Sequence, residues 1–502
     1  MAAVVVAAAW PAAGAAGGAT CYVWSGGTHT APYGDWTTAA TNIQTAVDYA
    51  SANYPAYDTV LVTNGAYNVT SQISITNGIT VRSFNGADVT TVQQTGTLNV
   101  RMFSLTHANA VLDGFTVRKG HGVDGSGVNM TAGTVTNCII RDNGTPNGDF
   151  ATMSGAGVYM TGGLLVRCTV VSNSFFGNTA GLGVWASGAG AVISHCTIAY
   201  NQHTRDTSAG GVYLAGGATL RNSLIRGNSV QNDRAGGGVY MTDANTLVES
   251  CTIVENTAGD GGGIYIAGGS VSNSIVCFNS AGANPNCRLG GNGLAYSCTT
   301  PLPAGPGNTD LDPLFMDRSA GNFQVFAGPA RNRGSVLPWM SASVDLNGNP
   351  RLDSNGSVDM GAYQRQSGAL ECSLSADAPR SGMAPLTVTF RSYVAALNTN
   401  GLVYRWDFQN DGGFDVEGGD RAVATNTYAA PGVYSVRLAV TNDGSETATY
   451  TNAGVVTVTL ADLYVSTNGS SQAPYTNLAT AATNFLDAFV LAGDGTRILV
   501  DS

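Results

Sequence analysis

The chain has 502 residues, only 11% of them charged, with 66 glycines and a formal net charge of −11. This charge argues against nucleic acid and anionic membrane surfaces as partners, because both are bound by basic patches. It also disfavours a strongly anionic substrate such as a polyuronate. The length allows two to four domains, and nine cysteines are too few for a disulfide framework in a chain of this size.

The first 20 residues form an apolar stretch that is too short to span a bilayer and ends in small residues. We interpret residues 1–20 as a signal-peptide-like segment, which predicts a protein that is secreted, extracellular or displayed at the cell surface. The positive amino-terminal region of a signal peptide is missing, so a low-complexity start is the alternative. No other segment reaches transmembrane length, and we expect no membrane span.

An amphipathic helix is predicted over residues 38–52, where Ile43, Ala46, Val47 and Ala50 follow helical spacing. The solenoid predicted below has an open apolar end, and this helix is well placed to cap it. Short strands are expected next at residues 59–63, 73–76, 79–84, 101–106 and 111–117.

Glycine-rich phrases of the form Gly-Gly-Gly-Val-Tyr-Met recur six times at steps of 25 to 30 residues, beginning at residues 125, 155, 181, 209, 236 and 261. Behind each one follows a second phrase, apolar-x-x-Cys/Ser-x-apolar-x-x-Asn. The runs are short, rich in Val, Ile, Thr and Tyr, and bounded by Gly, Asn or Asp. A period of this size predicts a parallel β-helix over residues 21–308, with successive coils about 4.8 Å apart.

Stacking of the coils predicts columns of equivalent residues. The first inward column is apolar: Val135, Leu165, Ile193, Leu220, Val248 and Val271. The second inward column holds small residues: Cys138, Cys168, Cys196, Ser223, Cys251 and Ser274. A third column ends each strand: Asn143, Asn173, Asn201, Asn228, Asn256 and Asn279.

Two expectations concern the chemistry of these columns. The asparagines suit left-handed backbone geometry and hydrogen bonds to the backbone of the next coil. The column cysteines are interpreted as buried space-fillers rather than nucleophiles or metal ligands. A disulfide between Cys277 and Cys287 is retained as a possible alternative.

The pleat of the Gly-Val-Tyr-Met phrase places valine and methionine inside and tyrosine outside. The outward column is Asn129, Tyr159, Trp185, Tyr213, Tyr240 and Tyr265. Its five aromatic members, Tyr159 to Tyr265, are the candidate ligand-binding residues, because sugar rings stack on aromatic faces. The alternative is that neighbouring rings stack on one another and only stabilise the sheet.

The carboxyl-terminal part divides into three segments. Residues 309–366 are interpreted as closing coils and a cap of the β-helix. Residues 371–459 alternate apolar and polar residues with frequent turns, which predicts a small β-sandwich. Residues 473–492 repeat residues 31–50 at a constant offset of 442, so residues 460–502 are interpreted as the truncated start of a second β-helix. The chain is therefore expected to be a piece of a longer protein.

These phrases, with "VLDGFTV" at 111–117 and "DPLF…DLNGNPR…VDMGAY" at 312–363, resemble bacterial right-handed parallel β-helix repeat proteins of the pectate-lyase-like superfamily. Residues 309–364 are similar to the choice-of-anchor segment of such surface proteins. Residues 371–459, with "YRWDF" and "YAAPGVYSVRLAVTN", resemble a PKD domain. The resemblance implies an all-β fold and a PKD module that is a non-catalytic extracellular spacer or a contact module. It does not single out an activity, because the superfamily includes lyases, hydrolases, adhesins and passive stalks.

Catalytic residues are not assigned. A polysaccharide lyase needs a base and a cationic group beside the uronate carboxylate, and a hydrolase needs two carboxylates about 5–10 Å apart. The polar candidates on neighbouring coils or in one loop are Arg167 with His195, Arg221 with Glu249, and the cluster Lys119, His121 and Asp124. Isolated polar side chains on a solenoid more often belong to a solvated face.

No cofactor is predicted. Calcium is kept open as an alternative for the oxygen-rich loops at residues 407–415 and 345–350. In the first loop a glutamine stands at the third ligand position and the closing glutamate is missing, so a turn held by Asx hydrogen bonds is favoured there.

The sequence therefore predicts an all-β modular protein made of a right-handed parallel β-helix with an amino-terminal cap helix, an Ig-like PKD domain and the start of a second β-helix. Its predicted partner is a polysaccharide or cell-surface glycan, bound through the aromatic column or contacted in adhesion, and the protein is expected to be a monomer. The alternative is a carbohydrate-active enzyme, a polysaccharide lyase or glycoside hydrolase, with its site on the β-helix flank.

Overall fold

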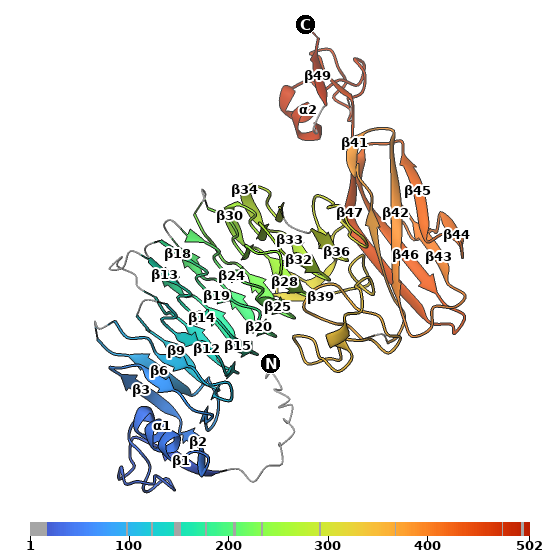
Figure 1. Cartoon of the computed structure of the whole chain (residues 1–502). Helices are drawn as coiled ribbons and strands as arrows, with labels where there is room; N and C mark the ends of the chain where they lie inside the picture. The colour runs from blue at the N-terminus through green and yellow to red at the C-terminus, as the bar shows by residue number, and fades with distance from the viewer. Residues whose placement is uncertain are drawn as a thin grey trace. The chain divides into compact units, whose positions relative to one another are not determined.

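The computed structural model describes residues 18–96, 99–121, 124–144, 152–175, 178–203, 207–231, 234–290, 293–366, 368–473, 475–492 and 496–501. Residues 1–17 of the predicted signal-peptide-like segment lie outside these ranges. The chain forms two compact units, one reaching to residue 308 and including residues 345–347, the other holding the remainder. Figure 1 shows that the first unit is a stack of short strands with one helix at its amino-terminal end.

Three parallel sheets form the walls of the first unit. The first sheet contains β1 Ala19–Val23, β2 Tyr57–Val62, β5 Thr80–Ser83, β8 Val111–Asp113, β11 Thr134–Thr136, β15 Gly163–Val166, β20 Ala191–Ser194, β25 Thr219–Arg221, β28 Leu247–Glu249, β32 Ser270–Ser272 and β36 Leu294–Ala295. The second sheet contains β3 Gly65–Val69, β6 Thr90–Gln94, β9 Thr116–Arg118, β12 Ile139–Arg141, β16 Thr169–Val171, β21 Thr197–Ala199, β26 Leu224–Arg226, β29 Thr252–Val254, β33 Ile275–Cys277 and β37 Cys298–Thr299. The third sheet contains β4 Ile73–Ile75, β7 Phe103–Leu105, β10 Val128–Met130, β14 Val158–Met160, β19 Val184–Ser187, β24 Val212–Ala215, β27 Val239–Met241, β31 Ile264–Ile266 and β35 Cys287–Leu289.

Shorter strands extend the loops between the second and third sheets. They are β13 Thr152–Ser154, β18 Asn178–Ala180 and β23 Thr207–Ser208 in one ladder, β17 Ser174–Phe175 with β22 Gln202–His203, and β30 Thr257–Asp260 with β34 Ser280–Ala283. Each coil from β2 to β35 thus contributes one strand to each wall, and the strands of neighbouring coils pair in parallel. The predicted parallel β-helix is confirmed.

The amino-terminal cap is formed by β1, β2 and helix α1, which spans Ile43–Ala52. The Asn42 side chain caps the helix by accepting a hydrogen bond from the Thr45 amide, so the helix begins later than the predicted residue 38. The apolar face predicted for this helix is buried, as expected for a cap. The Gln44 side chain accepts a hydrogen bond from the Ser74 amide of β4, which ties the helix to the first coil.

The strand predicted at residues 111–117 is in fact two strands. Gly114 adopts a φ of 78° and turns the chain between β8 and β9. The same corner recurs in later coils, where a residue with left-handed φ precedes the Cys/Ser column: Asn137, Arg167, His195, Asn222, Ser250, Asn273 and Tyr296. Strands β1, β3 and β6 were not predicted from the sequence.

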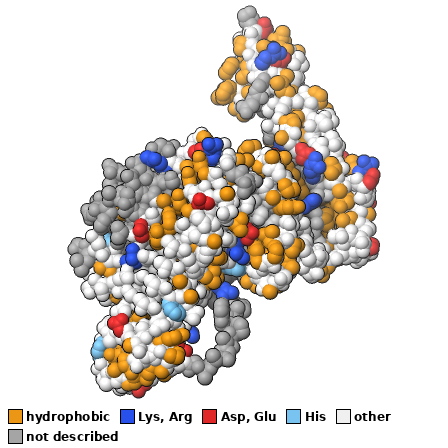
Figure 2. All heavy atoms as spheres, in the orientation of Figure 1, with side chains coloured by type: hydrophobic (Ala, Val, Ile, Leu, Met, Phe, Trp, Pro, Cys, Tyr) orange, Lys and Arg blue, Asp and Glu red, His pale blue; other side chains and the backbone are white. Residues whose placement is uncertain are grey.

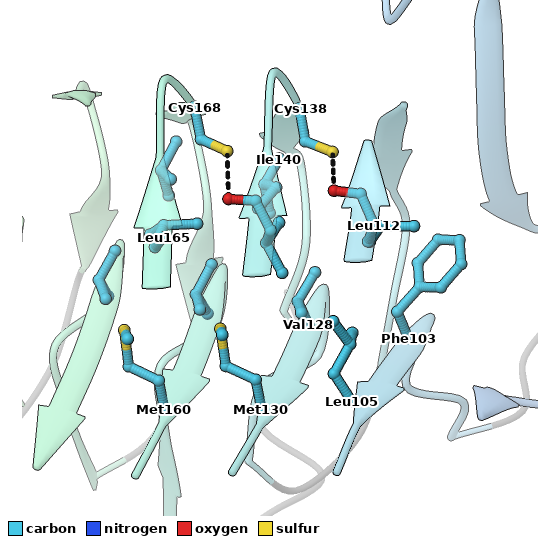
Figure 3. Packing of buried hydrophobic residues seen from close by; sticks show 14 of the residues in the cluster. Phe103, Leu105, Leu112, Val128, Met130, Cys138, Ile140, Met160, Leu165 and Cys168 are labelled. Atoms are coloured by element: carbon cyan, nitrogen blue, oxygen red, sulfur yellow. Dashed lines mark hydrogen bonds between the residues drawn. The ribbon is translucent and has the colours of Figure 1, made fainter. Parts of the chain in front are cut away.

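Buried columns fill the interior, as the repeat predicted. Val135, Leu165 and Ile193 are paired in register and are fully buried. Figure 3 shows these levels from the side, with side chains of neighbouring coils pointing into a common dry core. Each level therefore buries its apolar residues only by stacking on the next, so the coils depend on one another for stability.

The cysteine column is buried, and this prediction is confirmed. The Cys138 Sγ lies 3.9 Å from the Leu112 carbonyl oxygen and the Cys168 Sγ 3.6 Å from the Val135 carbonyl oxygen (Figure 3). Burial raises the pKa of Cys196 to about 12. The Cys196 thiol is therefore protonated at neutral pH and is not a nucleophile.

The Cys277–Cys287 disulfide kept open above is absent from the described residues, because both cysteines are free. Cys277 lies instead beside Cys298, with 3.8 Å between the sulfur atoms.

The asparagine column forms a continuous hydrogen-bonded ladder. The Asn173 Nδ2 donates to Asn201 Oδ1 at 3.0 Å, and the Asn201 Nδ2 donates to Asn228 Oδ1 at 2.9 Å. The amide of each asparagine donates to the same oxygen of the next, as at Asn173 to Asn201. The predicted bonding between coils is confirmed, and the buried amide groups are satisfied without water.

The left-handed geometry predicted for these asparagines is wrong. Positive φ angles belong to the residues just before them, such as Ser172, Tyr200 and Glu255. The preceding residue makes the turn, and the asparagine is thereby directed inward, where its side chain reaches both neighbouring coils.

Glycines directly before the third-sheet strands β10, β14, β19, β24, β27 and β31 allow the coils to approach closely. A Cβ on Gly211 would lie 2.4 Å from the Gly238 carbonyl oxygen of the next coil and 3.0 Å from the Asn228 Nδ2. Such distances are shorter than van der Waals contact, so the glycine repeat reflects a lack of space at this corner.

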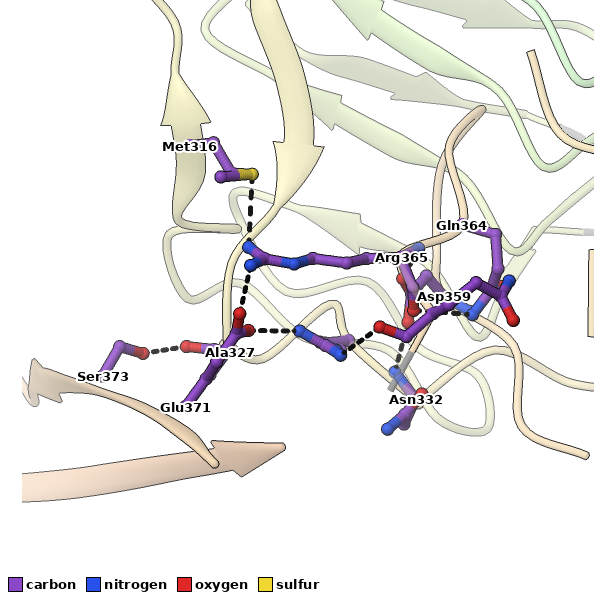
Figure 4. Close-up of polar contacts among 10 residues, drawn as sticks. Met316, Ala327, Asn332, Asp359, Gln364, Arg365, Glu371 and Ser373 are labelled. Carbon is purple, nitrogen blue, oxygen red and sulfur yellow. Dashed lines mark hydrogen bonds and ion pairs between the residues drawn. The ribbon is translucent and has the colours of Figure 1, made fainter. Parts of the chain in front are cut away.

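The second unit begins with the antiparallel pair β38 Phe315–Asp317 and β39 Asn322–Val325 and a short 3-10 helix, Pro338–Met340. A polar cluster follows (Figure 4). The Glu371 carboxylate is paired with the Arg331 Nη1 at 2.8 Å and with the Arg365 Nη2, and the Ser373 hydroxyl donates to the Ala327 carbonyl. The prediction that residues 309–366 close and cap the β-helix stays a prediction.

Asp359 belongs to this cluster and is fully buried. Its carboxylate accepts hydrogen bonds from the Asn332 and Arg365 amides, both at 2.8 Å (Figure 4). Burial nevertheless dominates and raises the pKa of Asp359 from 3.8 to about 6.

This pKa predicts a pH-dependent stability. Between pH 4 and 6 the folded chain holds a proton on Asp359 that the unfolded chain releases, so the free energy of unfolding falls as the pH rises through this range. For one group the loss is roughly 2 kcal/mol between pH 3.8 and pH 6. Urea unfolding of the wild type and Asp359→Asn at both ends of this window measures it. The stability difference between the two proteins should shift by this amount, and a difference that is independent of pH would contradict the assignment.

Two antiparallel sheets form the predicted β-sandwich. One contains β40 Glu371–Ala376, β42 Leu386–Ala395 and β45 Val423–Tyr428, and the other β41 Ser381–Met383, β47 Thr447–Thr459, β46 Gly432–Thr441, β43 Val403–Asp407 and β44 Val416–Gly418, with β41 joining β47 in parallel. Between them Trp406 is fully buried against Phe390 and Phe408. A small module at the end contains β48 Asp462–Val465, helix α2 Phe485–Leu491 and β49 Arg497–Val500.

Candidate functional site

The predicted aromatic column lies on the outer face of the third sheet. Tyr159 pairs in register with Trp185, Trp185 with Tyr213, and Tyr213 with Tyr240, which in turn pairs with Tyr265. The residues on either side of each ring in its strand are buried, whereas the rings themselves are half-buried. The period-2 pleat therefore places one aromatic ring per coil on the outer face, as predicted, and we call these five residues the aromatic ladder.

The rings of the aromatic ladder stack on one another. The ring centroids of Tyr159 and Trp185 are 4.4 Å apart, those of Trp185 and Tyr213 6.1 Å. The spacings continue at 5.5 Å from Tyr213 to Tyr240 and 4.8 Å from there to Tyr265, and the planes of every neighbouring pair lie within 6° of parallel. The inner ring faces are therefore covered by neighbouring rings, and solvent meets the ring edges.

This stacking changes the contact expected from the sequence. A sugar ring cannot lie on the face of an inner tyrosine, because the next ring already occupies that face. The ladder offers instead a line of phenol hydroxyls, C–H edges and one indole N–H. Burial raises the pKa of Tyr159, Tyr213 and Tyr240, so these hydroxyls are protonated at neutral pH and both donate and accept hydrogen bonds.

An arginine and an aspartate lie at each end of the aromatic ladder. At one end the Arg288 guanidinium lies 5.4 Å from the Tyr265 ring centroid and pairs with Asp260 at 3.1 Å. At the other end the Arg101 Nε donates to the Asp124 carbonyl oxygen at 2.7 Å, and the charges of both residues act on the pKa of Tyr159. The ladder is thus a bounded surface, about four coil spacings long between its first and last rings.

The sequence did not single out Arg288 or Arg101. Arg288 occupies the tyrosine position of β35, in register with Tyr265. It follows Tyr265 by 23 residues, so extending the repeat by one degenerate copy, "NCRL", would have found it. Arg101 precedes the strict repeats, and no sequence signal pointed to it.

The other polar candidates lie elsewhere on the β-helix or are held by local hydrogen bonds. Arg167 and His195 take left-handed φ values of 52° and 54° at the corner between the first and second sheets. The His195 Nδ1 is paired with the Ser194 hydroxyl at 2.7 Å. Arg221 and Glu249 are register partners in the first sheet, as predicted.

The three residues of the loop cluster are held by separate hydrogen bonds. The Lys119 amide donates to the Asp142 carbonyl and the His121 amide to the Val100 carbonyl. The Asp124 Oδ1 accepts from the Ser154 amide at 2.8 Å, which places this residue at the end of the aromatic ladder. The cluster therefore orders loops beside the third sheet.

The two loops weighed for calcium are turns held by hydrogen bonds. The Asp407 carboxylate accepts from the Asp411 and Gly412 amides at 3.1 and 3.0 Å, and the Asp415 Oδ2 accepts from the Phe408 amide. The Asx turn favoured from the sequence is confirmed, because the Gly413 amide donates to the Asp411 Oδ1 at 2.9 Å. In the second loop the Asp345 Oδ1 accepts from the Asn347 amide at 2.9 Å.

Charged side chains are thinly spread. Figure 2 shows them singly or in small groups on the visible face, with neutral and hydrophobic surface between them. Over the ranges that the structure describes, no helix has the length and apolar character needed to cross a bilayer.

Two segments match known families. Residues 179–300 match the family described as right handed beta helix region, and residues 372–455 match the PKD domain. A search among curated proteins found no match. The chain thus combines a right-handed parallel β-helix with an Ig-like PKD domain, and both domain types are typical of extracellular modular proteins.

Proposed function

We propose that this protein is secreted or displayed at the cell surface, where it acts as a monomer and binds an extended polysaccharide along the edge of the aromatic ladder. The observation that carries the proposal is the uninterrupted line of five half-exposed aromatic rings in successive coils. A linear polymer presents a regular series of hydroxyls and C–H groups, and a ladder with one ring per coil presents a regular series of partners.

Two further features support this choice of ligand. The ladder is rigid, because each ring is stacked on its neighbours and each strand is hydrogen-bonded on both sides, so little side-chain entropy is lost on binding. The hydroxyls of Tyr213 and Tyr240 are neutral, and the chain as a whole carries a net charge of −11. A neutral polysaccharide therefore fits better than an anionic one. The PKD domain would act as a spacer that holds the β-helix away from its point of attachment.

The proposal predicts that Tyr213→Ala/Tyr240→Ala weakens polysaccharide binding by about tenfold or more, because two central rings and their hydroxyls are lost. Tyr213→Phe/Tyr240→Phe keeps the stack and removes only the hydroxyls, so a smaller loss than for the double alanine variant, about two- to tenfold in total, is expected. Affinity electrophoresis against a panel of neutral and acidic glycans measures both effects.

Tyr200→Ala is the matched control. Tyr200 is 45% exposed and lies outside the ladder, with the Arg226 guanidinium 5.8 Å from its ring centroid. This variant should migrate as the wild type does on every glycan. Unchanged retardation of the double alanine variant on all glycans that retard the wild type would refute the proposal, provided that its circular dichroism shows an intact β-helix.

A further inference from the structure

The module at residues 460–501 repeats the amino-terminal cap in structure as well as in sequence. Tyr464 exchanges backbone hydrogen bonds with Tyr475 and Ala482, as Tyr22 does with Tyr33 and Ala40. In both modules an asparagine, Asn42 or Asn484, caps the helix through its side chain. In both, the two flanking strands pair in parallel, β1 with β2 and β48 with β49. The same sequence pattern has therefore produced the same cap twice.

The two caps differ in what covers them. In the amino-terminal cap Ile43 and Val47 are 2% and 1% exposed, because α1 packs on β2 and β4 of the first coil. Their counterparts Phe485 and Phe489 are 54% and 61% exposed. The strand that follows each helix shows the same contrast. Val62 at the end of β2 is fully buried, whereas its counterpart Val500 at the end of β49 is 66% exposed.

The exposed face of α2 is also more apolar than that of α1. Gln44 and Asp48 of α1 are hydrogen-bonded to each other, and Leu486 and Val490 stand at their positions in α2, 69% and 74% exposed. Figure 2 shows hydrophobic side chains gathered over this module. A helix that is apolar on nearly all sides is expected to be buried, and contiguous apolar patches on soluble proteins mark binding surfaces.

We propose that residues 460–501 are the cap of a second β-helix, and that the apolar face of α2 and β49 binds a parallel β-coil joined to β49. The occupant is a coil of the type formed by residues 63–96, which follows β2 in the amino-terminal unit. One strand of it would pair with the open edge of β49, as β5 pairs with β2. A second strand would cover Phe485 and Phe489, as β4 covers Ile43 and Val47.

The test is an extended chain in which residues 63–308 of this protein are joined directly after Val500, in the register that follows Val62. The proposal predicts that the amides of β49 exchange with deuterium roughly tenfold more slowly or better in the extended chain, because β49 gains a second neighbour. It also predicts loss of the fluorescence of 8-anilinonaphthalene-1-sulfonate that is due to this face. The fluorescence due to this face is measured on the original chain, as the dye fluorescence of the wild type minus that of Phe485→Asp/Phe489→Asp.

Two controls make the outcome decisive. In the first control, the added copies of Ile73 and Ile75 in the extended chain are replaced by aspartate. The amides of β49 should then exchange with deuterium as fast as they do in the original chain. In the second, Leu397→Asp removes a 71% exposed apolar side chain of the β-sandwich and should leave the exchange of β49 unchanged. Equal exchange of β49 and equal dye fluorescence in the original and extended chains would overturn the proposal. Neither result bears on polysaccharide binding by the aromatic ladder.

Discussion

Replacement of Gly238 by alanine is expected to lower the free energy of unfolding by about 3 kcal/mol or more. The new Cβ would lie 2.5 Å from the Gly263 carbonyl oxygen and 2.9 Å from both the Asn256 Nδ2 and the Ile253 Cγ2. The Gly263 oxygen is backbone of the next coil and cannot rotate away. Relief of the clash requires the two coils to separate, which breaks the hydrogen bonds and the apolar packing between them.

Gly190→Ala is the control for this substitution, since nothing lies within 4 Å of a Cβ placed there. Urea unfolding followed by far-ultraviolet circular dichroism should give a midpoint close to that of the wild type for Gly190→Ala and a clearly lower one for Gly238→Ala. Equal midpoints for the two variants would show that the coils are less tightly packed at this corner than described above.

Asn201→Ala is expected to cost about 4 kcal/mol or more, because the substitution leaves several buried polar groups without partners. The Asn201 Oδ1 accepts from the Asn173 amide and side chain, both at 3.0 Å. Its Nδ2 donates to Asn228 Oδ1 at 2.9 Å and to the Val170 carbonyl at 3.1 Å. Each orphaned group costs roughly 1–3 kcal/mol, and water cannot easily reach a ladder that is fully buried.

Asn245→Ala provides the comparison, because Asn245 is exposed and lies in a turn of the same unit. It should change the free energy of unfolding by less than about 0.5 kcal/mol. If Asn201→Ala proved as mild as Asn245→Ala, the asparagine ladder would not be a major source of stability.

The sequence predicted most of the β-helix because the period of the repeat determines the register. A strand that slips by one residue would turn Tyr213 inward and Val212 outward, so the buried pattern permits only one alignment. The inward columns and the aromatic ladder follow directly from that alignment. The cap helix was also visible, because Ile43, Ala46, Val47 and Ala50 follow helical spacing.

Features set by local backbone geometry were harder to predict. Strand β3, with the sequence Gly-Ala-Tyr-Asn-Val, lacks a clear apolar alternation, and it forms because β6 supplies a partner. The left-handed turns were assigned to the asparagines, whereas the residues before them make the turn. The repeat does not indicate which residue of a corner has the positive φ, because the residues with positive φ at the corners are of many different types.

The candidate site was predicted in position but not in form. Spacing placed Tyr213 and Tyr240 side by side, yet ring orientation depends on side-chain torsions that a repeat pattern does not determine. The parallel stack covers the ring faces, so the expected contact moves to the ring edges. The arginines at the ladder ends lie where the repeat degenerates, which is why only the structure brings them into the site.

Hydroxyl-radical footprinting of the aromatic ladder tests the central claim most directly. The claim is that stacked coils align five rings whose outer edge binds a polysaccharide. With the glycan that retards the protein most strongly, oxidation of Tyr213, Tyr240 and Tyr265 should fall, and oxidation of Tyr200 should stay the same. Equal oxidation of the three ladder tyrosines with and without that glycan would contradict the account.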